Sequence, residues 1–133
     1  MKVTTIKQKI VVQSTPEEVY EALMDADKHS KFTGSKAICN PRVGGKFTAW
    51  DGYIYGENLE LEKGKRIVQD WMTTEWLKGY PPSKLELTLK KIEEGTEIIM
   101  THSNVPAEQA EDINQGWIDY YWTPLKKYFK KIA

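Results

Sequence analysis

The spacing of hydrophobic and polar positions changes along the chain, and each spacing predicts a different kind of element. Residues 4–12 alternate between apolar and polar side chains, which is the period of a half-buried strand. A helix start follows, because Thr15 is a capping residue, Pro16 suits the first helical position and Glu18 completes a capping box. Apolar residues then recur at helical spacing, at Val19, Tyr20, Leu23 and Met24.

The sequence pattern of residues 35–104 is typical of consecutive β-hairpins. A second short helix over residues 27–32 precedes them and ends at Gly34. Short segments rich in Val, Ile, Thr, Trp and Leu are separated by turn signals, and Asp51-Gly52 is a strong signal for a two-residue hairpin. The other signals are Gly44-Gly45, Lys63-Gly64, Pro81-Pro82 and Glu94-Gly95. We therefore expect six strands in an antiparallel meander.

The last quarter of the chain predicts one long amphipathic helix over residues 106–132. Acidic residues lie near its start and lysines near its end, which suits the helix macrodipole. About 25 residues at ~1.5 Å each give roughly 37 Å, long enough to cross a small sheet. Pro124 is expected to kink this helix or to weaken one turn. The apolar stripe has spacings of four and three and consists of Ile113, Trp117, Tyr121, Leu125, Tyr128 and Ile132.

The order of these elements predicts the architecture. A strand, two short helices, six strands and a long helix pack most economically as an α+β fold. We expect a curved antiparallel sheet of about seven strands wrapped around the C-terminal helix, with the two short helices at one end. Residues 1–133 contain no repeat, low-complexity block or linker, and this length suits one domain.

Composition excludes several classes of function. Lys plus Arg and Asp plus Glu both number 19, so the formal net charge is zero, which argues against nucleic acid and anionic membranes as partners. No stretch approaches the ~20 apolar residues of a membrane span, and we expect a cytoplasmic protein. The single cysteine, Cys39, excludes an internal disulfide and a cysteine-based zinc cage. With no glycine-rich phosphate loop either, we expect no metal and no cofactor.

One ordered set of residues, spread over nearly the whole chain, resembles a known family. The set is Gly44-Gly45-Lys46-Phe47, Asp51-Gly52, Gly56, Glu60-Leu61, Arg66-Ile67-Val68, Trp71, Trp76, Ser83, Leu85, Leu87-Thr88-Leu89, Gly95-Thr96, His102, Pro106, Gly116-Trp117 and Tyr121. It resembles the Aha-type family, whose domains are similar to the C-terminal domain of the activator of heat shock protein 90 ATPase. The resemblance implies the helix-grip fold of the START-like (Bet v 1-like) superfamily, in which sheet and C-terminal helix enclose a cavity. Eukaryotic activators also carry a separate N-terminal domain, which we expect this chain to lack because it starts at its first strand.

The implied cavity has a predicted lining, which is Phe47, Trp71, Leu87, Met100, His102, Trp117 and Tyr121. His102 shares the strand parity of Ile98 and Met100, so we expect it to face the interior. It acts either as an acid, base or ligand-binding group, or as a core histidine bonded to backbone or to a tyrosine hydroxyl. We expect His29, in a polar run, to be exposed, and Trp122 to lie on the flank of the helix.

Three functions stay open at this point. The cavity can bind a small hydrophobic or aromatic molecule, which is the interpretation we favour. Alternatively, the chain is a protein-interaction module for the heat shock protein 90 chaperone. A third possibility is a cyclase- or hydrolase-like enzyme with His102 and a cavity tyrosine as acid and base, although no catalytic set stands out. No pattern identifies an oligomer interface, so we expect a monomer or a homodimer.

Overall fold

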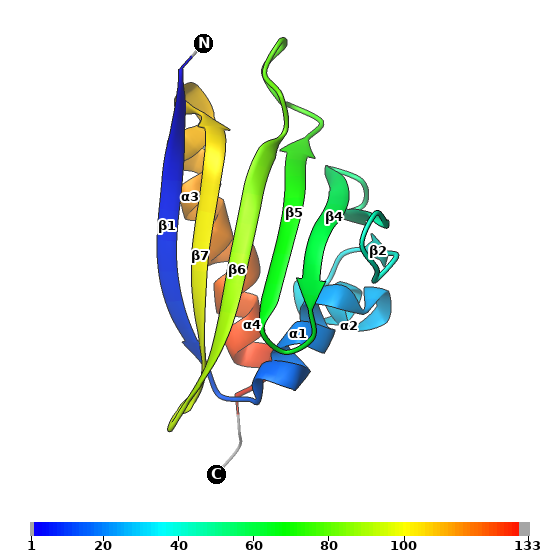
Figure 1. Ribbon diagram of the computed structural model, residues 1–133, viewed down its shortest axis with the longest axis vertical. Coiled ribbons are helices and arrows are strands. Elements are labelled where there is room, and N and C mark those ends of the chain that lie inside the picture. The colour runs from blue at the N-terminus through cyan, green and yellow to red at the C-terminus, as the bar shows by residue number, and fades with distance from the viewer. Residues whose placement is uncertain (1, 131–133) are drawn as a thin grey trace.

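The sheet has the predicted meander topology. The computed structural model describes residues 2–130, and its seven strands are hydrogen-bonded in the order β1-β7-β6-β5-β4-β3-β2. The strands are β1 (Val3–Val12), β2 (Ile38–Cys39), β3 (Lys46–Ala49), β4 (Ile54–Glu62), β5 (Arg66–Thr73), β6 (Ser83–Ile92) and β7 (Gly95–Pro106). Every neighbouring pair is antiparallel, and β1 lies beside the last strand, β7 (Figure 1). The α+β class and the curved seven-stranded sheet are confirmed.

The turn between β3 and β4 is longer than predicted. Ala49 pairs with Ile54, so four residues form the turn, whereas Asp51-Gly52 indicated two. Trp50 and Asp51 have positive φ values of 53° and 56°, a conformation that costs roughly 1–2 kcal/mol per residue outside glycine. The result is that the Trp50 ring lies 5.5 Å from the ring of Tyr120, on the C-terminal helix.

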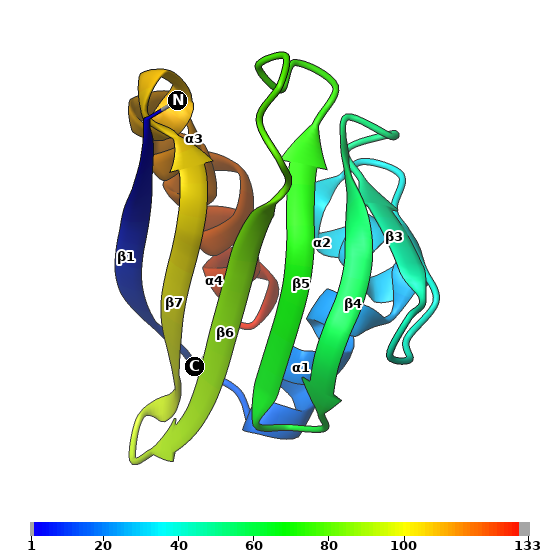
Figure 2. The ribbon, with the colours of Figure 1, turned by 45° about the horizontal axis from the view of Figure 1, so that its top comes forward.

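The two short helices begin and end where the sequence indicates. In α1 (Pro16–Met24), the Thr15 hydroxyl accepts the backbone N–H of Glu18 at 3.2 Å. The second half of the capping box differs from the expectation, because the Glu18 carboxylate accepts from the Ser14 hydroxyl. Gly34, with φ of 78°, ends α2 (Ala26–Thr33) in the left-handed conformation. Both helices lie on the same side of the sheet as the C-terminal helix (Figure 2).

The C-terminal helix runs without a break from Ala107 to Tyr128, but it is not regular. Its segments are a 3₁₀ turn η1 (Ala107–Gln109), α3 (Ala110–Trp117), a π turn η2 (Ile118–Trp122) and α4 (Thr123–Tyr128). Pro124 has no N–H to donate and its ring crowds the carbonyl four residues earlier, so the irregularity expected at Pro124 takes the form of the π turn just before it. Ile132, the last predicted stripe position, lies outside the described residues. Within residues 2–130, no helix is both long and apolar enough to cross a membrane.

The π turn changes which side chains face the sheet. It holds one residue more than an α turn, so Tyr121 and the next residue, Trp122, both point inward. Trp122 is only 2% exposed, and its Nε1–H donates to Gln8 Oε1 on β1 at 2.7 Å. Our expectation that Trp122 lies on the flank is wrong, because it assumed a regular α-helix. Tyr128, placed on the inward stripe, is more than a third exposed.

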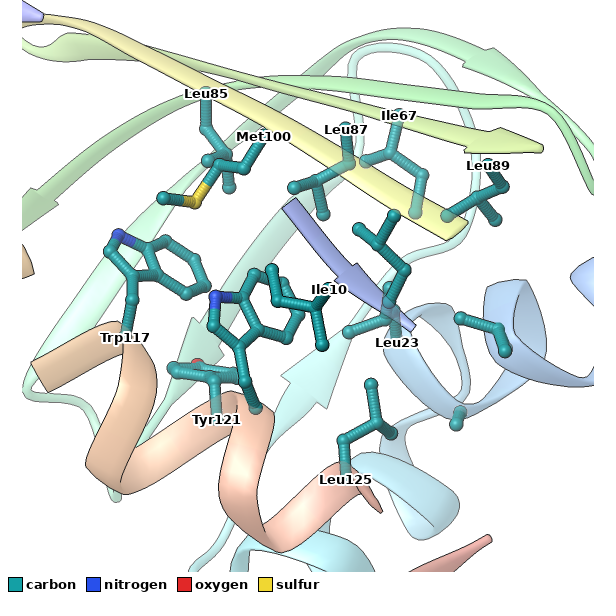
Figure 3. Close-up of a cluster of buried hydrophobic side chains, with 14 of the residues drawn as sticks. Ile10, Leu23, Ile67, Leu85, Leu87, Leu89, Met100, Trp117, Tyr121 and Leu125 are labelled. Carbon is teal, nitrogen blue, oxygen red and sulfur yellow. The ribbon is translucent and has the colours of Figure 1, made fainter. Parts of the chain in front are cut away.

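The hydrophobic core fills the space between the sheet and the helices. Figure 3 shows Leu85, Leu87 and Met100 of the sheet opposite Trp117 and Tyr121 of the helix. All five side chains are at least nine-tenths buried, and burying a side chain of this kind contributes about 1.5–3 kcal/mol. Trp117 and Tyr121 therefore pack the interior of the fold.

Candidate functional site

A groove of about 670 Å³ lies where the C-terminal helix passes the start of β4 and the end of β5. One wall is formed by the β3–β4 turn and the two strands, and the other by the helix between η1 and η2. Six aromatic residues line it: Trp50, Tyr53, Trp71, Trp117, Tyr120 and Tyr121. The remaining lining residues are Ile54, Thr73, Glu75, Gln109, Asp112, Ile113 and Gly116. Its volume is within the ~300–1,000 Å³ typical of small-molecule sites.

The rings of the groove pack on one another at its inner end. The centroids of Trp71 and Trp117 are 5.8 Å apart, and those of Trp117 and Tyr121 are 4.7 Å apart. These three residues are buried, whereas Tyr120 at the mouth is 58% exposed. The groove thus has a rigid aromatic floor and an open aromatic rim.

Two carboxylates stand at the rim. The Tyr53 hydroxyl donates to Glu75 Oε1 at 2.7 Å, and burial together with this bond raises the pKa of Tyr53. The Asp112 carboxylate also raises the pKa of Tyr53 by its charge. Gln109 Nε2 donates to the backbone carbonyl of Glu75 at 2.9 Å, which joins the helix to the end of β5.

Among residues 2–130, no three His, Cys, Asp or Glu side chains gather as a metal site would require.

Two polar atoms on the groove wall are buried without a partner. Within the described part of the chain, the Trp50 indole Nε1–H and Gln109 Oε1 form no hydrogen bond. The Tyr121 hydroxyl is near the Trp50 indole, but the two do not have hydrogen-bond geometry, and the pKa of Tyr121 is raised by burial. An unpaired buried polar atom costs about 1–3 kcal/mol, so the wall is less stable than a fully bonded one would be.

The residues predicted to line a cavity lie in three places. Three line the groove: Trp71, Trp117 and Tyr121. Two more line, together with these three, a hollow of about 30 Å³ inside the core: Phe47 and Leu87. The last two are completely buried and line neither space: Met100 and His102. A hollow of 30 Å³ has room for about one water molecule, so of these two spaces only the groove at the edge of the helix has room for a larger molecule.

His102 belongs to a buried chain of hydrogen bonds. Its Nδ1 accepts the indole Nε1–H of Trp117 at 3.1 Å, and its Nε2 lies 2.7 Å from Ser83 Oγ. The Ser83 hydroxyl donates to the carbonyl of Trp71, also at 2.7 Å. An indole N–H can only donate, and the Ser83 proton is directed to the carbonyl, so the histidine proton sits on Nε2 and is donated to Ser83.

This chain of bonds makes His102 a neutral core residue. Its side chain is completely buried, and burial lowers its pKa to about 3. A second proton on Nδ1 would face the N–H of Trp117, so the network resists protonation. The structural interpretation of His102 is supported, with Ser83 and Trp117 as partners instead of backbone or a tyrosine. The acid–base interpretation lacks support, because this ring does not reach the groove.

His29 is not exposed, in contrast to our expectation. Its Nδ1 lies 3.0 Å from the carbonyl of Leu23 and its Nε2 lies 3.3 Å from the Tyr121 hydroxyl. Its ring packs 5.0 Å from that of Phe32. Burial lowers the pKa of His29, and the bond to Leu23 offsets part of this effect. The polar sequence around His29 suggested exposure. In the structure, α2 packs against the C-terminal helix, and the His29 side chain points inward.

Sequence reasoning missed most of the groove, because only three of its thirteen lining residues were predicted to line a cavity. It did not single out Trp50, Tyr53, Glu75, Gln109, Asp112 or Tyr120 as site residues. The one available signal was that Trp50 precedes the Asp51-Gly52 turn, where backbone of unusual φ can re-aim a side chain. No periodicity reveals that Glu75 and Asp112, on elements far apart in the chain, share one opening.

Comparisons with known proteins agree with this architecture. A family model described as Activator of Hsp90 ATPase homolog 1-like protein matches residues 13–130. The Activator of 90 kDa heat shock protein ATPase homolog 1 of Homo sapiens is 32% identical over 127 residues, which cover 94% of this chain and 36% of the human protein. The chain therefore spans about a third of the length of that relative.

Two solved structures superpose along almost their full length. An HSP90 activator from Plasmodium falciparum has a TM-score of 0.82 and 26% identity, with 95% of this chain and 94% of that chain covered. The Aha1 dimer from Colwellia psychrerythraea has a TM-score of 0.80, covers 98% of this chain and 99% of that chain, and at 17% identity shows the fold alone. The Aha-type resemblance and the helix-grip fold are confirmed, and the chain belongs to the Activator of Hsp90 ATPase homolog 1-like family.

Proposed function

We propose that this chain binds the Hsp90 chaperone of its own cell and changes its ATPase rate. The observation that carries this proposal is the match to the Plasmodium falciparum HSP90 activator, a chain of nearly the same extent and the same fold. The family match over residues 13–130 and the identity with the human activator support it. The human protein is much longer, so the interaction proposed here is that of the shared domain.

Purified components test this proposal directly. The chain is titrated into the Hsp90 homologue of the same organism, with binding followed by calorimetry and ATP hydrolysis by a coupled assay. We expect saturable binding and a rate change that reaches its plateau at the same concentration. An Hsp90-specific ATP-site inhibitor identifies background hydrolysis. Absence of both binding and a rate change would refute the proposal.

We propose, as a second function, that the groove binds a small apolar or aromatic molecule. Its support is the volume of about 670 Å³ and the six rings that line it. The rim of the groove is exposed to water, and the rings of its floor are fixed by packing. When a flat molecule enters, such rings bury a large apolar area at little entropic cost.

The groove offers a variant that separates this function from the first. Gly116 lies in the helix wall, and a Cβ built there meets only the Tyr120 ring, at 3.8 Å. The backbone at Gly116 thus has room for a Cβ, and we expect Gly116→Leu to place its side chain in the groove. A ligand at 100 times its Kd stabilises the native chain by about 2.7 kcal/mol, and this stabilisation should vanish in the variant. Equal stabilisation of both proteins would place the ligand elsewhere.

A further inference from the structure

The charge at the groove is entirely negative. Glu75 and Asp112 are the only charged residues among those that line it. Within residues 2–130, neither carboxylate forms an ion pair. Two acidic groups that face one opening with no cation between them repel each other and attract a positive ligand.

The Glu75 carboxylate is held in place. The Tyr53 hydroxyl bonds one of its oxygens at 2.7 Å, and its backbone is fixed by bonds from Gln109 and to Thr73. Its second oxygen has no partner in the described part of the chain. A carboxylate that is oriented before binding loses little entropy when a ligand N–H arrives, and such charge-assisted bonds are among the stronger ones.

The surrounding rings suit a cation as well. The rings of Trp50 and Tyr120 meet nearly edge to face at 5.5 Å, with an interplanar angle of 72°, and both line the groove. Ring faces attract an ammonium group within about 6 Å of their centroids, and tryptophan does so most strongly. The same wall that accepts an apolar body therefore favours a positive charge attached to it.

Gly116 keeps the helix wall of the groove open. A glycine inside a helix costs about 1 kcal/mol relative to alanine. Packing does not require this glycine, because a Cβ would make only an ordinary contact with Tyr120 at 3.8 Å. The missing side chain leaves the helix wall of the groove open between Asp112 and Tyr120.

We infer that the groove binds a small organic cation, an ammonium group carried on an aromatic body. The aromatic body lies on the floor formed by Trp71 and Trp117, and the ammonium group lies at the rim between Glu75 and Asp112. This inference rests on the second proposed function and goes beyond it, because it assigns the charge of the ligand.

A matched series of indoles tests the inference. Tryptamine, tryptophol and indole-3-acetate share one ring system and carry a positive, a neutral and a negative side chain. In calorimetric titrations we expect a Kd for tryptamine roughly tenfold below that for tryptophol, and weaker binding still for indole-3-acetate. Higher salt should narrow the difference, since the charges lie at an open rim.

Variants show whether the two carboxylates cause the preference. Glu75→Gln with Asp112→Asn should remove the preference, so that the Kd of tryptamine equals that of tryptophol in the double variant. Glu108→Gln is the matched control, because Glu108 is exposed on the same helix and does not line the groove. It should keep the preference.

The possible failures are distinct. Equal Kd values for tryptamine and tryptophol would overturn the cation inference and leave the groove as a neutral ligand site. A preference that survives in the double variant would also overturn it. If none of the three indoles binds the wild-type chain, both the groove function and the cation inference are overturned.

Discussion

Replacement of His102 by Gln should remove a large part of the acid sensitivity of this fold. Burial lowers the pKa of His102 from 6.5 to about 3 in the folded state, whereas the unfolded chain keeps the ordinary value. Between these two values the unfolded state binds a proton that the folded state does not. The free energy of unfolding therefore rises with pH across this window, and stability is lost as pH falls below 6.5.

The size of the effect follows from the two pKa values. At pH 5 the histidine of the unfolded chain is almost fully protonated, and this stabilises the unfolded state by about 2 kcal/mol relative to pH 7.5. Urea unfolding followed by tryptophan fluorescence measures this difference at both pH values. We expect the wild-type difference to exceed that of His102→Gln by about 2 kcal/mol, because the variant lacks this titrating group.

A second histidine variant is the control. His29→Gln changes a ring that is less deeply buried and lacks the Trp117 and Ser83 bonds, so most of the pH dependence should persist. The variant at His102 is expected to be less stable at pH 7.5 as well, by about 1–3 kcal/mol, since Gln cannot meet both partners in the same geometry. An unchanged pH dependence in His102→Gln would show that this ring is charged or solvated in the folded state, contrary to the hydrogen-bond chain.

The structure supports three other predictions. Ser83→Ala should lower the free energy of unfolding by about 2–4 kcal/mol in urea titrations, because it leaves a histidine N–H and a carbonyl unpaired. The control Ser103→Ala, at a half-buried serine with only a long bond of 3.5 Å to the Lys84 carbonyl, should change it by under about 0.5 kcal/mol. Gly116→Ala should raise the free energy of unfolding by about 1 kcal/mol and the Tm by roughly 3–5 °C in calorimetry, and a lower Tm would mean that Gly116 is needed for packing. Trp122→Phe should cost about 1–3 kcal/mol, because Gln8 Oε1 loses its donor; a neutral result in the same titrations would show that water replaces the indole.

The secondary structure was largely predictable because its causes are local. Thr15 and Pro16 start α1 by capping and by a preset φ, and Gly34 ends α2 by its left-handed conformation. Alternation over residues 4–12 matches β1, and the consecutive turn signals match the hairpins of the sheet. In each case the physical cause lies within a few residues of its effect.

The tertiary structure alone decided which side chains meet. His102 bonds Ser83 on the neighbouring strand and Trp117 on the helix, so its neutral, enclosed state depends on partners that sequence spacing does not specify. Trp122 turns inward because Pro124 and the packing against β1 favour a π turn, which a 3.6-residue period cannot express.

The groove likewise depends partly on the sequence pattern and partly on the tertiary structure. The sequence by itself determined that rings gather on the C-terminal helix and that a curved sheet lies opposite them. It did not determine that Trp117, Tyr121 and Trp122 fill the interior, nor that a groove opens between Trp50, Glu75 and Asp112 at one edge. The physical reason is that patterning records whether a side chain is buried or exposed, whereas the shape of a site depends on distances between segments that only the folded chain brings together.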